Sequence, residues 1–204
     1  FAILTKAGID FKIEERTAAV NTTAADTRRE KLGHYLGGTL YYGGEWYWGL
    51  DRLHYLEERL MDMGLRHGGN GRDFIYAPPQ SPAGLGRTNT DLHWYLSFRS
   101  PYTAIVRDRV KSLADAYGAD LKIRFVLPMV MRDLPVPKAK KKYITLDTAR
   151  EARRHCVDFG GVLDPVGRPV ELGYSLLPWA RNHGREYEYV QGWLKAVWAE
   201  GIDA

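Results

Sequence analysis

Ser100 has the sequence setting best suited to chemistry in this chain. It follows a β-type run at 93–98 and precedes Pro101, a residue favoured at the first position of a helix. A side chain between a strand and a helix lies where free backbone N–H groups and the helix dipole favour an anion. A hydroxyl there could hold a bound thiolate, so that no protein cysteine is required. The alternative is a serine that only caps the helix.

Two further groups of polar side chains are candidates for ligand binding. Asp51 lies in the first turn of a predicted helix, where a carboxylate is favourable even without a ligand. Lys138, Lys141 and Tyr143 could face an anionic substrate, although a solvated loop explains the same residues. Each group therefore has a structural interpretation beside the functional one.

The single cysteine restricts the redox and metal chemistry of the chain. One thiol, Cys156, cannot form an intrachain disulfide, a CxxC pair or a cysteine zinc site. We expect it to be buried and unreactive, because it shares an apolar stripe with Ala149 and Ala152 on a helix predicted to begin at Asp147. The six histidines show no metal-ligand spacing, so we predict no metal site. One unpaired thiol fits a cytoplasmic protein, the localisation we predict.

The composition is that of a globular protein with a substantial core. The 204 residues are 45% hydrophobic and 26% charged, and no apolar run reaches the roughly 20 residues that cross a bilayer. Most of the net charge of +4 is local, in the lysines of segment 138–142. We interpret this segment first as a solvated basic face, with an anionic small molecule as the alternative. We therefore predict a small-molecule substrate, and neither a membrane nor a nucleic-acid partner.

Local patterns divide the chain into three stretches. Residues 1–65 read as helix, helix, hairpin and helix, and the hairpin is marked by Gly43-Gly44 between two β-rich runs. Residues 66–90 are rich in glycine and proline, which predicts a linker. Residues 91–204 open with strand 93–98, a helix from Ser100 to Gly118 and strand 121–127. Such a βαβ unit makes its two strands parallel, and further helices follow.

Four short motifs resemble one known family. The Ser-Pro-Tyr turn within 98–102, the helix start at 48–53, the segment 136–150 and the segment 197–203 are similar to DsbA-like thioredoxin folds. The resemblance is to the branch of 2-hydroxychromene-2-carboxylate isomerases and kappa-class glutathione transferases. It implies an α/β, thioredoxin-like fold with a helical insertion, its halves in permuted order. Residues 1–65 match the closing ββα half, and residues 91–204 match the opening βαβ half plus the insertion.

The inverted order of the halves has two explanations. The chain could belong to a tandem of two DsbA-like domains, or it could be one circularly permuted domain. In either case we expect the hairpin 39–48 to pair with strands 93–98 and 121–127, because a lone hairpin is marginal in water. The pairing could form within the chain or by exchange between two chains of a homodimer.

The resemblance also implies a glutathione site. In the family the serine equivalent to Ser100 holds the glutathione sulfur as a thiolate, and Pro101 and Tyr102 complete its motif. An aspartate equivalent to Asp51, with the Gly49-Leu50 backbone, receives the γ-glutamyl ammonium. Gly38 stands where the family has a cis-proline that pairs with the tripeptide, and Lys138 would face a glutathione carboxylate.

We therefore predict a glutathione-dependent isomerase or transferase of the DsbA-like class, acting on a small electrophile. One alternative is a non-catalytic thioredoxin-fold module that binds a protein or peptide. The other is a DsbA-type oxidoreductase by family label, although the CxxC pair is absent.

Overall fold

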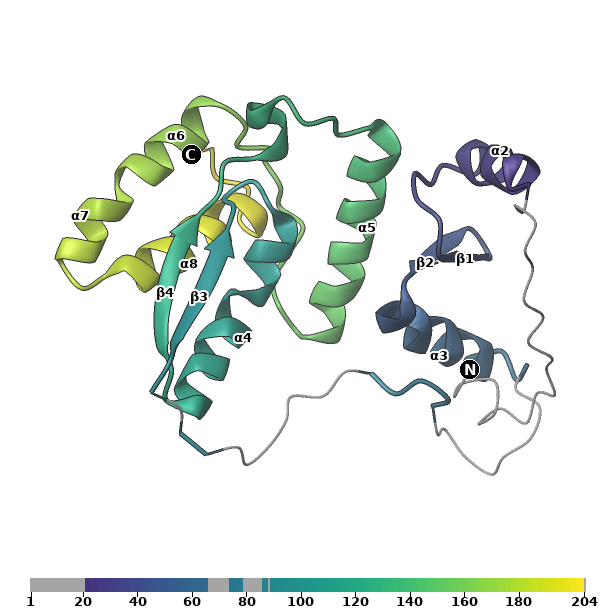
Figure 1. Cartoon of the computed structure of the whole chain (residues 1–204), viewed down its shortest axis with the longest axis horizontal. Helices are drawn as coiled ribbons and strands as arrows, with labels where there is room; N and C mark the ends of the chain where they lie inside the picture. Colours follow the sequence, from purple (N-terminus) through teal and green to yellow (C-terminus); the bar gives the residue numbers. More distant parts are fainter. Residues whose placement is uncertain (1–20, 66–73, 79–85, 88, 204) are drawn as a thin grey trace. The chain divides into compact units, whose positions relative to one another are not determined.

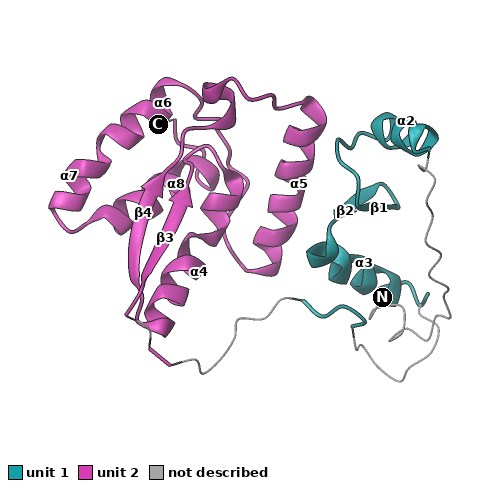
Figure 2. Cartoon of the chain, viewed as in Figure 1, with its two compact units in different colours: residues 1–83 teal, residues 84–204 magenta. Residues whose placement is uncertain are grey.

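The computed structural model describes residues 21–65, 74–78, 86–87 and 89–203. The chain divides into two compact units, residues 1–83 and residues 84–204 (Figure 2). The first helix expected within 1–65, and most of the predicted linker, lie outside the described residues.

The first unit contains the predicted helix, hairpin and helix (Figure 1). Its elements are α2 (Thr23–Lys31), β1 (Thr39–Tyr42), β2 (Glu45–Trp48), the 3-10 turn η1 (Leu50–Arg52) and α3 (Leu53–Asp62). Gly43 and Gly44 make the hairpin turn with φ of 55° and 88°. Two consecutive positive φ angles suit a two-residue hairpin loop, so the sequence prediction of this turn is confirmed.

The hairpin is fastened to α3 of its own unit. Arg59 donates hydrogen bonds to the carbonyl oxygens of Tyr42 and Gly43, each at 3.2 Å, and to the hydroxyl of the buried Tyr47. The Glu57 carboxylate accepts from the backbone N–H groups of Ile75 and Tyr76, at 2.7 and 2.8 Å. Part of the predicted linker 66–90 is therefore held against α3.

The aromatic side chains of the hairpin pack within their unit. The ring of the buried His34 lies 4.8 Å from Trp46 and 5.0 Å from Tyr35. Burial lowers the pKa of His34, and the nearby Arg29 adds to that effect. The hairpin aromatics therefore serve as packing residues in this unit.

The second unit opens with the predicted βαβ arrangement (Figure 1). Its elements are β3 (Asp91–Leu96), α4 (Pro101–Tyr117), β4 (Asp120–Phe125), the 3-10 turn η2 (Met129–Arg132), α5 (Lys138–Arg154), α6 (Arg168–Ser175), α7 (Leu177–Asn182) and α8 (Glu186–Trp198). The two strands are parallel, with Leu96 beside Phe125 at their carboxyl ends. Gly118 ends α4 in the left-handed conformation, φ 62°, as its position predicts.

One contiguous core holds the second unit together. Buried apolar side chains from β3, β4, α4, α6, α7 and α8 form a single cluster that includes Leu96, Phe98, Ile123, Val190 and Leu194. Val190, Leu194 and Val197 form the inner face of α8 and are almost fully buried. Among the described residues, no helix combines the length and apolarity needed to cross a bilayer.

Two predictions about α5 are wrong. The helix begins at Lys138 and not at Asp147, and Asp147 is buried in its interior. Its carboxylate does not cap a helix start. It accepts hydrogen bonds from the side chains of Tyr102 and Arg150. Cys156 is exposed, because α5 ends at Arg154 and the chain turns to a φ of 53° at the cysteine. The apolar stripe therefore does not extend to it.

Each unit has its own two-stranded sheet. In the first unit β1 and β2 pair antiparallel, and in the second unit β3 and β4 pair parallel. Within its unit the hairpin packs on α3, through Tyr47 and Arg59. The expected pairing of the hairpin with strands 93–98 and 121–127, within the chain or by exchange between two chains, stays a prediction.

Candidate functional site

The turn between β3 and α4 is held from behind by two helices. The hydroxyl of Tyr174, on α6, accepts a hydrogen bond from the Phe98 N–H at 2.9 Å. The indole Nε1 of Trp198, on α8, donates to the Phe98 carbonyl oxygen at 2.9 Å. Phe98 has no exposed surface, so both of its backbone groups would be costly to leave without partners. These bonds fix the backbone two residues before Ser100.

The ring of Phe98 is sandwiched between two aromatic side chains. It stacks on Tyr174 at 4.7 Å between ring centroids and on Trp193 at 4.1 Å. This close approach requires a glycine at position 173, since a Cβ there would lie 2.9 Å from ring atoms of both Phe98 and Trp193. The packing therefore adds to the backbone hydrogen bonds in fixing the turn.

Ser100 is the N-cap of α4. Its φ of −99° and ψ of 115° are extended, and its Oγ accepts a hydrogen bond from the Thr103 N–H at 3.2 Å. Pro101 occupies the first helical position, as the sequence predicts. Because a hydroxyl has one hydrogen as well as its lone pairs, the capping bond leaves the Ser100 O–H able to donate. The capping and the thiolate-binding interpretations are therefore compatible.

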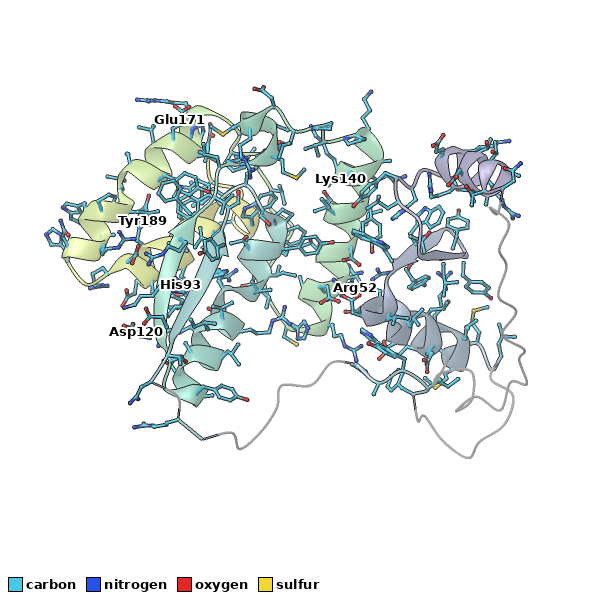
Figure 3. The ribbon with its side chains drawn as sticks, viewed as in Figure 1. Arg52, His93, Asp120, Lys140, Glu171 and Tyr189 are labelled. Carbon is cyan, nitrogen blue, oxygen red and sulfur yellow. The ribbon has the colours of Figure 1, made fainter. Side chains whose placement is uncertain are left out.

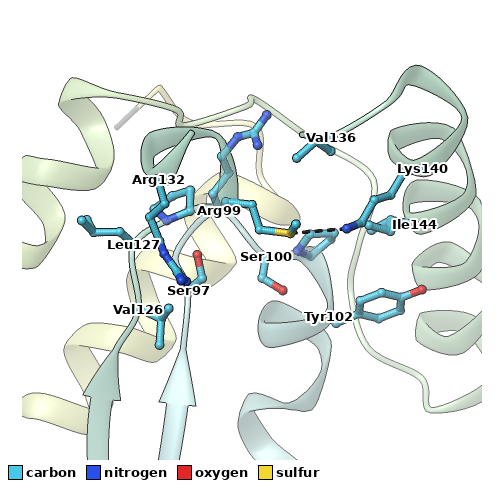
Figure 4. Close-up of a pocket in the computed structure, with 13 residues that line it drawn as sticks. Ser97, Arg99, Ser100, Tyr102, Val126, Leu127, Arg132, Val136, Lys140 and Ile144 are labelled. Atoms are coloured by element: carbon cyan, nitrogen blue, oxygen red, sulfur yellow. Dashed lines mark hydrogen bonds between the residues drawn. The ribbon is translucent and has the colours of Figure 1, made fainter. Parts of the chain in front are cut away.

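A cavity of about 280 Å³ lies beside Ser100 (Figure 4). It is bounded by the carboxyl ends of β3 and β4, the start of α4, the turn η2 and the start of α5. Its lining consists of Ser97, Arg99, Ser100, Pro101, Tyr102, Val126, Leu127, Pro128, Met129, Arg132, Val136, Lys140 and Ile144. The predicted strand–helix residues Ser100, Pro101 and Tyr102 thus share one cavity.

The cavity lining is cationic. It contains three basic side chains and no carboxylate. Arg99 is paired with Asp164, through contacts of 2.6 and 2.5 Å, so its charge is largely balanced. Lys140 Nζ contacts the Met129 sulfur at 3.4 Å, and the exposed Arg132 has no carboxylate partner among the described residues. With the amino end of the 17-residue helix α4, these charges favour an anionic ligand.

Tyr102 contributes a wall of the cavity. Its hydroxyl points away from Ser100 toward α5 (Figure 4) and donates to Asp147 Oδ2 at 2.7 Å. Asp147 Oδ1 accepts from Arg150 at 2.5 Å, and the carboxylate is 2% exposed. The hydrogen bonds of Asp147 therefore connect α4 to α5. They also hold the Ser100 turn, at the start of α4, against the helix that carries Lys140.

Lys140, and not Lys138, is the lysine that lines the cavity. Lys138 is the first residue of α5 and is exposed, and it does not line the cavity. The lining residues Lys140 and Ile144 are four positions apart on α5, which is the spacing of one helix face. That spacing was the available signal, and it was missed because the segment was interpreted as a solvated loop.

The remaining predicted residues belong to the first unit. Gly38 has a φ of 69°, and its carbonyl oxygen accepts from the Gly49 N–H at 3.2 Å. Asp51 forms an ion pair of 2.6 Å with its neighbour Arg52. Leu50 is exposed, at 59%. Gly38 and Gly49 are therefore neighbours in the structure. Their role toward a ligand of Ser100 stays a prediction.

The described residues contain no group of three His, Cys, Asp or Glu side chains that could hold a metal ion. The rings of the two buried histidines pack against aromatic side chains. His34 lies beside Trp46, and His54 lies beside Tyr55.

Comparison with known proteins gave one solved structure. No protein-family model matches the chain, and no curated protein matches it. The chain is similar to the structure of selenomethionine 2-hydroxychromene-2-carboxylate isomerase, with a TM-score of 0.42 and 23% sequence identity. The similarity covers 54% of this chain and 57% of the isomerase chain, so this chain spans little more than half of that protein.

Proposed function

We propose that this chain binds glutathione beside Ser100 and uses it in an isomerase or transferase reaction on a small electrophile. The observation that carries the proposal is the position of a capping serine, with a hydroxyl hydrogen to donate, in a cationic cavity without a carboxylate. Bound glutathione would supply a nucleophilic thiolate. The resemblance of the Ser-Pro-Tyr turn to the isomerase and kappa-class transferase branch supports the same assignment.

The chain's own residues have separate roles in this proposal. The Ser100 hydroxyl donates a hydrogen bond to the sulfur anion, and the amino end of α4 adds a positive field. Arg132 and Lys140 hold a carboxylate of the tripeptide or of the substrate. Each of these interactions stabilises the anionic form of the ligand more than its neutral form.

The apolar part of the lining favours an apolar electrophile. Val126, Leu127, Val136 and Ile144 line the same cavity as the cationic side chains. Apolar walls with a few convergent polar groups are typical of small-molecule sites, where the polar groups fix orientation. A small, partly apolar substrate would fill this space and reduce the water around the sulfur.

Disulfide exchange is not the activity we propose. The cavity lining contains no cysteine, and the one thiol of the chain, Cys156, follows the end of α5.

We also propose that Asp51 and the Gly49-Leu50 backbone serve a glutathione site. The segment that carries them would complete such a site within the chain or by exchange between two chains.

Glutathione titration with a charge-reversed variant tests the proposal. Binding only to the native state should stabilise the wild type by about 2.7 kcal/mol at a hundredfold excess over Kd. Arg132→Glu should weaken binding by roughly tenfold, because it replaces an attractive charge with a repulsive one. Arg168→Glu is the matched control, since Arg168 is exposed on α6 and does not line the cavity.

A wild type that shows no thermal shift at millimolar glutathione would overturn the proposed function. A non-catalytic binding module would then be the better interpretation. Equal weakening by Arg132→Glu and Arg168→Glu would reject the assigned cavity, because it would reduce the effect to net charge.

A further inference from the structure

The Tyr174 hydroxyl bonds to the chain just after each of the two strand ends that border the cavity. It accepts from the Phe98 N–H after β3 and donates to the Val126 carbonyl oxygen after β4, each at 2.9 Å. The last backbone bond between the strands runs from the Val126 N–H to the Leu96 carbonyl oxygen, at 2.7 Å, so the Tyr174 bridge extends the link from Leu96 to Phe98. Phe98 leads into Ser100, and Val126 leads into the segment that carries Met129 and Arg132.

The surroundings of Tyr174 make these bonds hard to replace. The residue is 7% exposed, and its ring lies between Phe98 at 4.7 Å and Phe125 at 4.6 Å. Burial raises the pKa of Tyr174, which keeps the hydroxyl protonated and able to donate to Val126. Water has little access to take over either bond, so both strand ends would lose a fixed partner together.

We propose that Tyr174 is a positioning residue for Ser100. Its hydroxyl fixes the backbone at Phe98 against Val126, and thereby the placement of the Ser100 hydroxyl relative to Arg132. Trp198 supports the same turn from the other side, by donating to the Phe98 carbonyl oxygen. The catalytic consequence rests on the proposed function, whereas the effect on the turn does not.

The test compares Tyr174→Phe with Tyr189→Phe. Tyr189, labelled in Figure 3, lies on α8 in the same core, and its hydroxyl donates to the Gly173 carbonyl oxygen at 2.7 Å. Each variant removes one partly or wholly buried phenol oxygen, but only Tyr174 bonds to the cavity walls. Tyr174→Phe removes two hydrogen bonds and Tyr189→Phe removes one, so Tyr189→Phe controls for the loss of a phenol oxygen from this core while leaving both cavity bonds in place.

Two measurements separate positioning from general destabilisation. Amide hydrogen exchange should become at least about tenfold faster at Phe98 in Tyr174→Phe, and stay near the wild-type rate in Tyr189→Phe. With glutathione and an aromatic electrophile, Tyr174→Phe should lower kcat by about tenfold and raise the pKa of the bound thiol, with little change in KM. Tyr189→Phe should change neither quantity.

Equal exchange rates at Phe98 in the two variants would overturn the proposal, whether or not glutathione binds. Faster exchange with an unchanged thiol pKa and kcat would overturn the positioning role and leave a structural one. If the wild type binds no glutathione, the proposed function fails and the exchange rates still decide whether Tyr174 fixes the turn. Trp198→Phe removes the other side-chain bond to Phe98 and replaces Tyr174→Phe if that variant does not fold.

Discussion

Replacing Gly173 with alanine measures how closely the core is packed behind Ser100. An alanine Cβ at this position would lie 2.9 Å from Phe98 Cδ2 and Cε2 and 2.9 Å from Trp193 Nε1. All three atoms belong to buried or half-buried rings that are stacked at 4.1 Å, so they have little room to move. Overpacking of this kind costs about 1–3 kcal/mol, while alanine in a helix regains up to about 1 kcal/mol over glycine. We expect a net loss of about 1–2 kcal/mol.

The same substitution at Gly192 is the control, and its sign should be opposite. Gly192 lies inside α8, and an added Cβ there meets nothing within 4 Å. Gly192→Ala should therefore stabilise the protein by about 0.5–1 kcal/mol through helix propensity alone. Urea unfolding followed by tryptophan fluorescence compares the midpoints of the two variants with the wild type. If Gly173→Ala is as stabilising as Gly192→Ala, the packing described around Phe98 is wrong.

Three other properties can be checked directly. Cys156 is exposed, so native protein should react with a maleimide nearly as fast as unfolded chain, and slow labelling would contradict its described position. Burial, with the charge of Asp108 adding to it, raises the pKa of Tyr187 to about 12. A tyrosine with a higher pKa in the folded state stabilises the fold while protonated, so stability should fall between about pH 10 and pH 12, and Tyr187→Phe should flatten that fall. Glu57→Ala should speed proteolysis near residues 75–76, because it removes the acceptor of both backbone N–H groups, and Glu58→Ala provides a comparison.

The features that were predictable from sequence depend on a few neighbouring residues. The Gly43-Gly44 turn, the Ser100 cap with Pro101 and the Gly118 helix end are all present as expected. Each is determined by backbone conformations that glycine, serine or proline favours locally. The turns and helix ends that depend only on such local preferences were predicted correctly.

The features that were missed depend on residues far apart in the chain. Asp147 has the residue type of a helix cap, but its carboxylate bonds to Tyr102, which is 45 residues earlier, inside a longer helix. A helix that begins at Lys138 would have predicted Lys140, and not Lys138, as the lysine that lines the cavity. The clamp on Phe98 by Tyr174 has no local sequence signal either, because the two residues are 76 positions apart.

The serine hydroxyl can be tested apart from the cap that it provides. Loss of an N-cap costs about 1 kcal/mol of stability, whereas a hydrogen bond to an anion is worth about 1.5–3 kcal/mol. Ser100→Ala should therefore melt a few degrees lower and also bind glutathione with a raised thiol pKa. Ser100→Thr keeps a hydroxyl and should restore most of both properties.

The most direct measurement is the ultraviolet absorbance of the glutathione thiolate as a function of pH, with wild-type protein and with Ser100→Ala. We predict that wild-type protein lowers the pKa of bound glutathione below that of free glutathione, and that Ser100→Ala raises it by about 1 to 2 units, the equivalent of one hydrogen bond to an anion. A Ser100→Ala variant that melts lower yet leaves the thiol pKa unchanged would show that the serine only caps α4, and would contradict the proposed site.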